Sequence, residues 1–164
     1  MKSSIFAIVL ALFAIGAGPV DQLERFAGTW QTQGTFVATP YSKAATATGT
    51  TNCAWSNDRL FMICQQSNVL GGKPDHNVAI YTYDEGPQVY RFYNVHAGNS
   101  ASGTIAIVGD TVTYPFSFND GGKTVDILTT NVWKSPTEYA WRTEYSIDGK
   151  KTWTLMASGT STKT

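Results

Sequence analysis

Two histidines and three carboxylates are the side chains of this sequence best suited to acid–base catalysis. His76 and His96 lie at the ends of strand-like segments, whereas Asp126, Glu138 and Glu144 lie within such segments. Paired carboxylates can act as general acid and base, and a hairpin can bring Asp126 close to Glu138. One functional hypothesis is therefore a hydrolase or isomerase that uses these carboxylates or His96. The competing interpretation is that carboxylates on strands face solvent.

The two cysteines are better explained by a disulfide than by catalysis. Cys53 and Cys64 flank the segment CAWSNDRLFMIC, in which Asn57-Asp58-Arg59 is a turn signal. With Asp58 and Arg59 in the loop, Cys53 lies directly opposite Cys64, which predicts a cross-strand disulfide. A redox pair would normally show C-x-x-C spacing, and zinc would need more soft ligands. We expect no metal site and no catalytic cysteine.

Composition excludes several classes of partner. The chain has 164 residues, 12 Lys+Arg and 12 Asp+Glu, so that its formal net charge is zero. A nucleic-acid-binding protein would show a basic face, and a polybasic membrane-surface protein would show a cluster of cations. A 13% share of aromatic residues also argues against disorder. These numbers predict one folded domain with few ionisable groups available for catalysis.

The first residues have the layout of an export signal. Lys2 is followed by an uninterrupted apolar run from Ile5 to Ile15 and then by small residues. The run is shorter than the ~20 residues that cross a bilayer. We predict a signal peptide over 1–18, cleaved after about Gly16, although a buried N-terminal helix is the alternative. The mature domain, 19–164, is then secreted or periplasmic and has no membrane span.

The rest of the chain predicts an all-β fold. A short helix is expected from Val20 to Phe26, with Asp21 as its cap and Glu24 completing a capping box. Many short strands between turn signals indicate a sandwich or a barrel, and large side chains on both strand faces favour a barrel. We predict a single antiparallel up-and-down barrel of about ten strands. These are 28–38, 44–56, 60–68, 76–84, 88–96, 101–108, 111–118, 123–133, 138–146 and 151–162.

The opening of the first strand carries a family resemblance. The segment Leu23-Glu24-Arg25-Phe26-Ala27-Gly28-Thr29-Trp30 places a G-x-W after a short helix. This resembles the opening of the lipocalins and the wider calycin superfamily, in which the helix closes one barrel end and the Trp packs there. The segment from Glu144 to Trp153 resembles the closing hairpin of small exported bacterial proteins related to nitrobindin and fatty-acid-binding proteins. The resemblance implies a calycin-type barrel.

The same resemblance implies structural roles for several residues. In lipocalins an Arg on a late strand stacks on the opening Trp, which implies that Arg142 covers Trp30 by a cation–π contact. The segment S-I-D-G-K-K-T-W also resembles the Asp-box turn, a structural hairpin. It implies structural roles for Ser146, Asp148, Gly149 and Trp153.

Haem is the cofactor that the resemblance raises first, because nitrobindin binds it through a histidine. That histidine lies late in the chain, and this sequence has no histidine after His96. The ligand therefore cannot be carried over, and we expect no cofactor.

A barrel of this size can enclose one small ligand, and large rings on the strands are the natural lining. Trp133 and Trp141 are expected to face each other across the turn at 134–137. The alternative is that the rings only fill the core. The candidate lining residues are Trp55, Tyr81, Tyr83, Tyr90, Phe92, Trp133 and Trp141.

The sequence as a whole favours a binding protein over an enzyme. We expect an exported protein, monomeric or weakly dimeric, that binds a small hydrophobic or aromatic molecule. A third hypothesis is an interaction module whose exposed Trp and Tyr side chains contact another protein or a carbohydrate.

Overall fold

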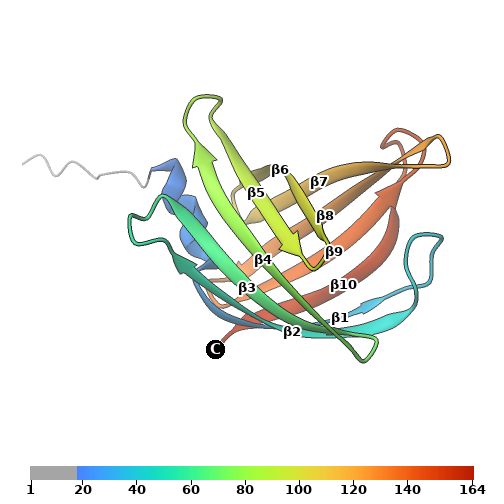
Figure 1. Cartoon of the computed structure of the whole chain (residues 1–164), viewed down its shortest axis with the longest axis horizontal. Coiled ribbons are helices and arrows are strands. Elements are labelled where there is room, and N and C mark those ends of the chain that lie inside the picture. Colours follow the sequence, from blue (N-terminus) through green and yellow to red (C-terminus); the bar gives the residue numbers. More distant parts are fainter. Residues whose placement is uncertain (1–17) are drawn as a thin grey trace, which may run out of the picture.

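The chain forms a closed barrel of ten antiparallel strands, as predicted, behind a short 3₁₀ helix (Figure 1). The computed structural model describes residues 18–164. The elements are η1 (Pro19–Phe26), β1 (Gly28–Phe36), β2 (Ala45–Trp55), β3 (Phe61–Leu70), β4 (Lys73–Asp84), β5 (Val89–His96), β6 (Asn99–Val108), β7 (Thr111–Asp120), β8 (Lys123–Ser135), β9 (Glu138–Ser146) and β10 (Thr154–Lys163).

Each strand pairs with the next along the chain, and β1 pairs with β10 to close the sheet. Tight turns make this meander possible. The β3–β4 turn at Gly71-Gly72 and the β7–β8 turn at Gly121-Gly122 have positive φ at both glycines. Glycine adopts this left-handed backbone without steric cost, which suits two-residue hairpins.

The register decides which side chains point into the barrel. Cys53 lies directly opposite Cys64, and the predicted disulfide between them is present. Both cysteines lie on the inner face and are buried. Side chains alternate between the two faces along a strand, and directly paired residues share a face. The inner face of every strand therefore follows from the pairing.

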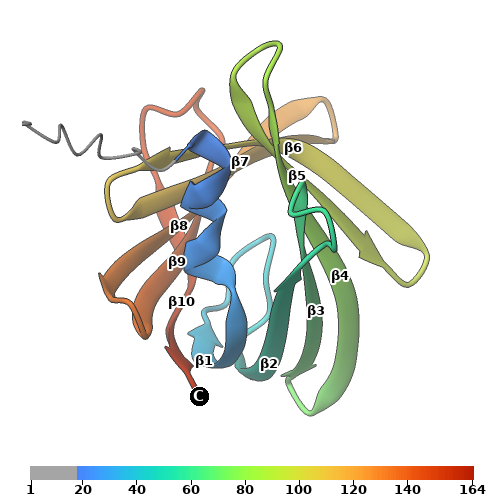
Figure 2. The same ribbon diagram turned by 90° about the vertical axis from the view of Figure 1, so that its left-hand side faces the viewer.

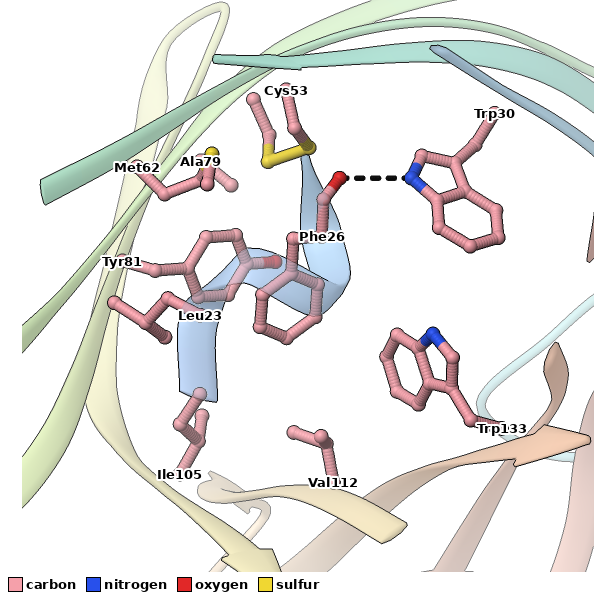
Figure 3. Close-up of a cluster of buried hydrophobic side chains, with 11 residues drawn as sticks. Leu23, Phe26, Trp30, Cys53, Met62, Ala79, Tyr81, Ile105, Val112 and Trp133 are labelled. Atoms are coloured by element: carbon pink, nitrogen blue, oxygen red, sulfur yellow. Dashed lines mark hydrogen bonds between the residues drawn. A yellow bond between two sulfur atoms is a disulfide. The ribbon is translucent and has the colours of Figure 1, made fainter. Parts of the chain in front are cut away.

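Helix η1 crosses one end of the barrel and closes it (Figure 2). Leu23 and Phe26 point inward from the helix and are buried. Phe26 stacks on Tyr81 with ring centroids 4.7 Å apart and meets Trp133 edge-on at 5.4 Å. The indole N–H of Trp30 donates to the Phe26 carbonyl oxygen over 2.8 Å (Figure 3). This hydrogen bond satisfies the one polar atom of a ring that is 2% exposed.

Three expectations about this end and about the final hairpin are wrong. The helix begins at Pro19, one residue earlier than expected, and its N-cap is Gly18 rather than Asp21, whose carboxylate accepts the N–H of Gly18 from within the first turn. Lys163, not Arg142, lies over Trp30, with its amine 5.1 Å from the ring centroid. Arg142 faces outward and pairs with Glu144 at 3.0 Å. The last strand begins at 154 rather than 151, because residues 147–153 form a loop.

That loop has the hydrogen bonds of an Asp-box turn. The Asp148 carboxylate accepts the hydroxyl of Thr152 at 2.6 Å and the backbone N–H groups of Lys151 and Thr152 at 3.0 Å each. These hydrogen bonds hold the pKa of Asp148 well below its usual value, and the bond from the Thr152 hydroxyl has the largest effect. Ser146 accepts the N–H of Lys150 and donates to Asp148. Gly149 and Lys150 both have positive φ, and Trp153 is half-buried.

The export signal expected over 1–18, with its cleavage after Gly16, lies outside the described residues apart from Gly18. Within residues 18–164, no helix has both the length and the apolar character needed to span a bilayer.

Removing the disulfide should destabilise the barrel. The bond closes a loop with a sequence separation of 11, so we expect the double variant Cys53→Ala/Cys64→Ala to lose ~2–3 kcal/mol in urea unfolding. Reductant should lower the stability of the unmodified protein by a similar amount and leave the double variant unchanged. Equal stability of the double variant and the unmodified protein in the absence of reductant would contradict the prediction.

Candidate functional site

A cavity of about 340 Å³ lies inside the barrel, directly above the buried side chains of the closed end. The cysteines of the disulfide form part of its wall, and rings and polar groups form the remainder. Its lining residues are Phe26, Trp30, Thr51, Cys53, Cys64, Gln66, Ala79, Tyr81, Phe92, Asn94, Tyr114, Phe116, Thr129, Asn131 and Tyr139.

Inward-facing glycines help to keep the barrel hollow. A Cβ atom on Gly159 would lie 2.6 Å from Cζ2 of Trp141, and one on Gly34 would lie 2.8 Å from Cη2 of the same ring. Gly34 and Gly159 are paired across β1 and β10, so the Trp141 ring lies against the wall instead of filling the lumen. We call Trp141, Gly34 and Gly159 the Trp141 platform. The ring of Phe92 similarly packs against Gly103.

The cavity wall is polar but uncharged within the described part of the chain. Its polar groups are the hydroxyls of three tyrosines and two threonines and the amides of Gln66, Asn94 and Asn131. Burial raises the pKa of Tyr81 to about 12. Burial likewise raises the pKa of Tyr114 and Tyr139. All three phenols are therefore neutral at pH 7, available both to donate and to accept hydrogen bonds.

The cavity reaches solvent beside a seam in the barrel wall. Strands β6 and β7 pair through only three residue pairs, from Val108 opposite Thr111 to Ala106 opposite Thr113, and then diverge (Figure 2). Residues 115–120 along the β7 side of this seam are exposed. Phe116 lines the cavity and yet is 51% exposed, so it lies where the lumen opens.

Six polar side chains on β3, β4 and β5 face into the barrel, and they extend from the cavity towards the far end. Gln66 and Asn94 line the cavity, and the register places the others on the same face of these strands. The ring of His96 and the carboxylate of Asp75 are hydrogen-bonded to each other, and Asn94 donates to Asn77 at 3.4 Å. We call this set the polar wall. It comprises Gln66, Asn68, Asp75, Asn77, Asn94 and His96.

The other side of the far end is apolar. Tyr41, from the loop between β1 and β2, meets Phe118 and Tyr145 edge-on, with centroids 5.8 and 5.0 Å apart. Tyr41 and Tyr145 also pack on a buried cluster of Val125, Ile127 and Met156. The far end of the lumen thus has an apolar side, formed by Tyr41 and by β7–β10, and a polar side formed by β3–β5.

All seven predicted lining residues point into the barrel by register, but only Tyr81 and Phe92 touch the cavity. The indole of Trp55 donates to Glu24 at 2.7 Å beneath Arg59. Tyr83 and Tyr90 contact each other. These three lie at the rim of the closed end.

The two late tryptophans do not face each other as expected. Trp133 pairs with Tyr139, and Trp141 pairs with Asn131. Trp133 belongs to the buried core of the closed end, where Arg25 lies 5.4 Å from its ring centroid. Ser135 pairs with Glu138, so the turn consists of Pro136 and Thr137 rather than 134–137, and a register shift between Trp133 and Ser135 then places Trp133 opposite Tyr139.

The three strand carboxylates proposed for catalysis face outward. Asp126 accepts the hydroxyl of Ser117 at 2.6 Å, Glu138 pairs with Lys134, and Glu144 pairs with Arg142. Asp126 and Glu138 lie at opposite ends of their hairpin, so they form no catalytic pair. His76 is also outside and contacts Ser67. Residues 18–164 contain no cluster of three or more His, Cys, Asp or Glu side chains that could hold a metal.

The polar lining residues were not predicted from the sequence, because only large aromatic side chains were considered as a cavity lining. The predicted pairing of Cys53 with Cys64 carried a usable signal. Once those cysteines are placed inside, counting by two along each strand puts Thr51 and Gln66 on the inner face. Asn131 and Thr129 follow in the same way from Trp133.

The chain matches the model of one protein family over most of its length. The family model described as "Protein of unknown function (DUF1579)" matches residues 19–163. The chain belongs to this family. A search of curated proteins returned no match.

Solved structures resemble this DUF1579 barrel in fold. The crystal structure of Rv2717c from M. tuberculosis is 14% identical, with a TM-score of 0.58 over 90% of this chain and 98% of that one. A structure of EF1p2_mFAP2b bound to DFHBI is 13% identical, with a TM-score of 0.47 over 90% and 100%. The redesigned β-barrel b11L5F_LGL is 12% identical, with a TM-score of 0.48 over 90% and 99%.

Adding one methyl group beneath Trp141 should destabilise the DUF1579 barrel. In Gly159→Ala the new Cβ meets the backbone carbonyl oxygen of Gln33 as well as the Trp141 ring, so we expect a loss of ~1–3 kcal/mol in urea unfolding and a changed near-ultraviolet circular dichroism spectrum. Gly86→Ala is the matched control, because the nearest atom to a Cβ there is 3.7 Å away. Similar stabilities for the two variants would show that Gly159 is not closely packed, and an unchanged near-ultraviolet spectrum would show that Trp141 does not rest on Gly159.

The buried phenols should make the DUF1579 barrel sensitive to alkali. Folding holds the proton of Tyr81 more tightly than the unfolded chain does, so the contribution of Tyr81 is complete below pH 10. It is lost as the pH rises towards 12, the pKa of Tyr81 in the folded state. We expect the free energy of unfolding to fall over this range, together with delayed tyrosinate absorbance. Tyr81→Phe should show a shallower fall, and an unchanged slope would contradict the assignment.

Proposed function

We propose that this chain is an exported binding protein that holds one small, uncharged, ring-bearing molecule inside the barrel. The observation that carries the proposal is the cavity of about 340 Å³ whose described lining combines seven aromatic rings with the neutral polar side chains of five further residues. Cavities of this size are typical of small-molecule sites.

The chemistry of the lining supports an uncharged ligand. Moving a charge into a poorly solvated cavity is costly unless an opposite charge meets it, and none of the lining side chains is charged at neutral pH. A fatty acid would bring a carboxylate into the cavity without a cation to receive it. The raised pKa values of the tyrosines reflect the same low polarity.

The chemistry also requires hydrogen-bonding groups on the ligand. A purely hydrocarbon ligand would displace water from the amides of Gln66, Asn94 and Asn131 without replacing its hydrogen bonds. A ring that carries hydroxyl, carbonyl or amide groups can stack on Tyr114 or Phe92 and satisfy these amides together. The hydrophobic or aromatic ligand expected from the sequence is therefore narrowed to an uncharged ring compound with polar edges.

Export and family placement belong to the same proposal. The apolar N-terminal run has the layout of a signal peptide, and the Cys53–Cys64 disulfide is typical of an oxidising compartment. The up-and-down topology, the helix across one end and the buried Trp30 support a calycin-type barrel. We propose that the mature domain, 19–164, acts in the periplasm or outside the cell, as a monomer or a weak dimer.

The interaction-module hypothesis finds less support. All five tryptophans lie within the described residues, and each is buried or half-buried. The exposed large aromatic side chains of the described chain are Tyr93, Phe116 and Phe118, of which Phe116 belongs to the cavity itself.

Filling the cavity should abolish binding without unfolding the barrel. Thr51 lines the cavity, whereas Thr48 on the same strand is exposed on the outer face. We expect Thr51→Phe to weaken binding of a neutral ring probe, 2-naphthol, at least tenfold in fluorescence titration, and Thr48→Phe to leave it unchanged. Both variants should keep the far-ultraviolet circular dichroism spectrum, because aromatic residues suit strands.

Native mass spectrometry of protein purified from its own organism supplies the independent test. We expect a bound neutral molecule that is absent from Thr51→Phe. Failure of the unmodified protein to bind 2-naphthol or to retain any such molecule would overturn the proposed function.

A further inference from the structure

We propose that the outer half of the lumen is a subsite for a sugar ring, so that the ligand is a glycoside. Its uncharged aglycone occupies the cavity, and its sugar lies between the Trp141 platform and the polar wall. This inference rests on the proposed function and names the ligand class of the same site.

The Trp141 platform provides a flat apolar surface that no other ring covers. The aromatic side chains of the cavity and closed end pair with one another, as Phe26 does with Tyr81 and Trp133 does with Tyr139. Trp141 has no ring–ring contact among the described residues. One side of its ring is backed by Gly34 and Gly159, and the whole residue is half-buried on the inner face. The indole N–H is buried and has no hydrogen-bond partner within residues 18–164, and we infer that the side of the ring away from the two glycines is the stacking face.

The polar wall provides the hydrogen bonds that hydroxyl groups require. Side-chain amides donate and accept from one group, and four of the six residues are Asn or Gln. Asn68 lies over Gly49, where a Cβ would collide with its amide, so its side chain is held against the wall. The Asp75 carboxylate is hydrogen-bonded to the His96 ring, so both side chains are held in place on the polar wall.

The strand order sets these two surfaces against each other. In the closed ring of ten strands, β9 is five positions from β4 in either direction. Trp141 on β9 and the polar wall centred on β4 therefore occupy opposite walls. Both adjoin the cavity, because Asn131 and Asn94 line it, Asn131 is paired with Trp141, and Asn94 bonds Asn77.

A sugar ring matches this combination better than a second aromatic ring does. A pyranose has an apolar C–H face that stacks on an indole and a periphery of hydroxyls that each donate and accept. A second aromatic ring would stack equally well but would displace water from the half-buried amides of the polar wall without replacing its hydrogen bonds. The inner cavity, which is richer in rings, takes the aglycone.

Three probes separate the aglycone from the sugar: 2-naphthol, 2-naphthyl β-D-glucopyranoside and glucose, each titrated by calorimetry into the full mature domain. We expect the glycoside to bind at least tenfold more tightly than 2-naphthol, and glucose alone to bind weakly. Trp141→Leu should raise the Kd of the glycoside at least fivefold, towards that of 2-naphthol, and should leave the Kd of 2-naphthol unchanged. Trp55→Leu, which changes a tryptophan outside the cavity, should alter neither value.

A second variant on the opposite wall keeps the test decisive if Trp141→Leu misfolds. Asn68→Leu should likewise weaken the glycoside and spare 2-naphthol. Equal affinity of the unmodified protein for glycoside and 2-naphthol, or glycoside binding insensitive to both substitutions, would overturn the sugar subsite and leave the proposed function standing. Replacement of glucose by galactose in the glycoside tests which hydroxyl pattern the wall prefers, and tight binding of either sugar supports the subsite. Absence of 2-naphthol binding would instead overturn the proposed function itself.

Discussion

Closure of the sheet between β1 and β10 is the constraint on which the rest of this molecule depends. The pairing that runs from Trp30 opposite Lys163 to Phe36 opposite Ala157 joins the first strand to the last. It leaves neither strand with an open edge. It also fixes which alternate side chains face inward on every strand, because the period along a strand is two. Ten strands enclose a wider interior than eight, so an interior filled only at one end is a natural result.

The two ends of the barrel differ in the side chains that fill them. At the closed end, η1 contributes Leu23 and Phe26 to a core that also contains Trp30 and Trp133, and this end provides most of the buried apolar area. At the far end, a small apolar cluster around Val125 and Ile127 occupies one side, whereas the inward positions of β3–β5 hold amide and other polar side chains that contribute little to stability. The division is typical of binding proteins, in which a rigid scaffold holds a site that is not optimised for packing.

Local sequence patterns predicted the fold well, because the residues that favour a turn or a strand lie within short segments of the chain. The strand number, the early helix and the disulfide could be predicted from Gly-containing turns, β-branched runs and the symmetric placement of Cys53 and Cys64. The face that each strand turns inward could not, since large residues occur at both parities in β5 and β9. The partner of Trp30 was missed for a related reason: the cation comes from Lys163, which closure alone brings beside it. The polar lining was missed because Asn and Gln on a strand look like surface residues until the register is known.

The seam between β6 and β7 has a consequence for motion. Three residue pairs hold this ladder, whereas β7 and β8 share ten, so the smallest opening free energy in the barrel belongs here. Fluctuations should concentrate at the tip of the β5–β6 hairpin, because Ile105 holds the base of this hairpin in the core of the closed end. Pro115 adds to this, since it cannot donate a hydrogen bond that would extend the ladder. A rigid molecule wider than the resting gap can therefore enter if the tip bends outward while Ile105 stays in place.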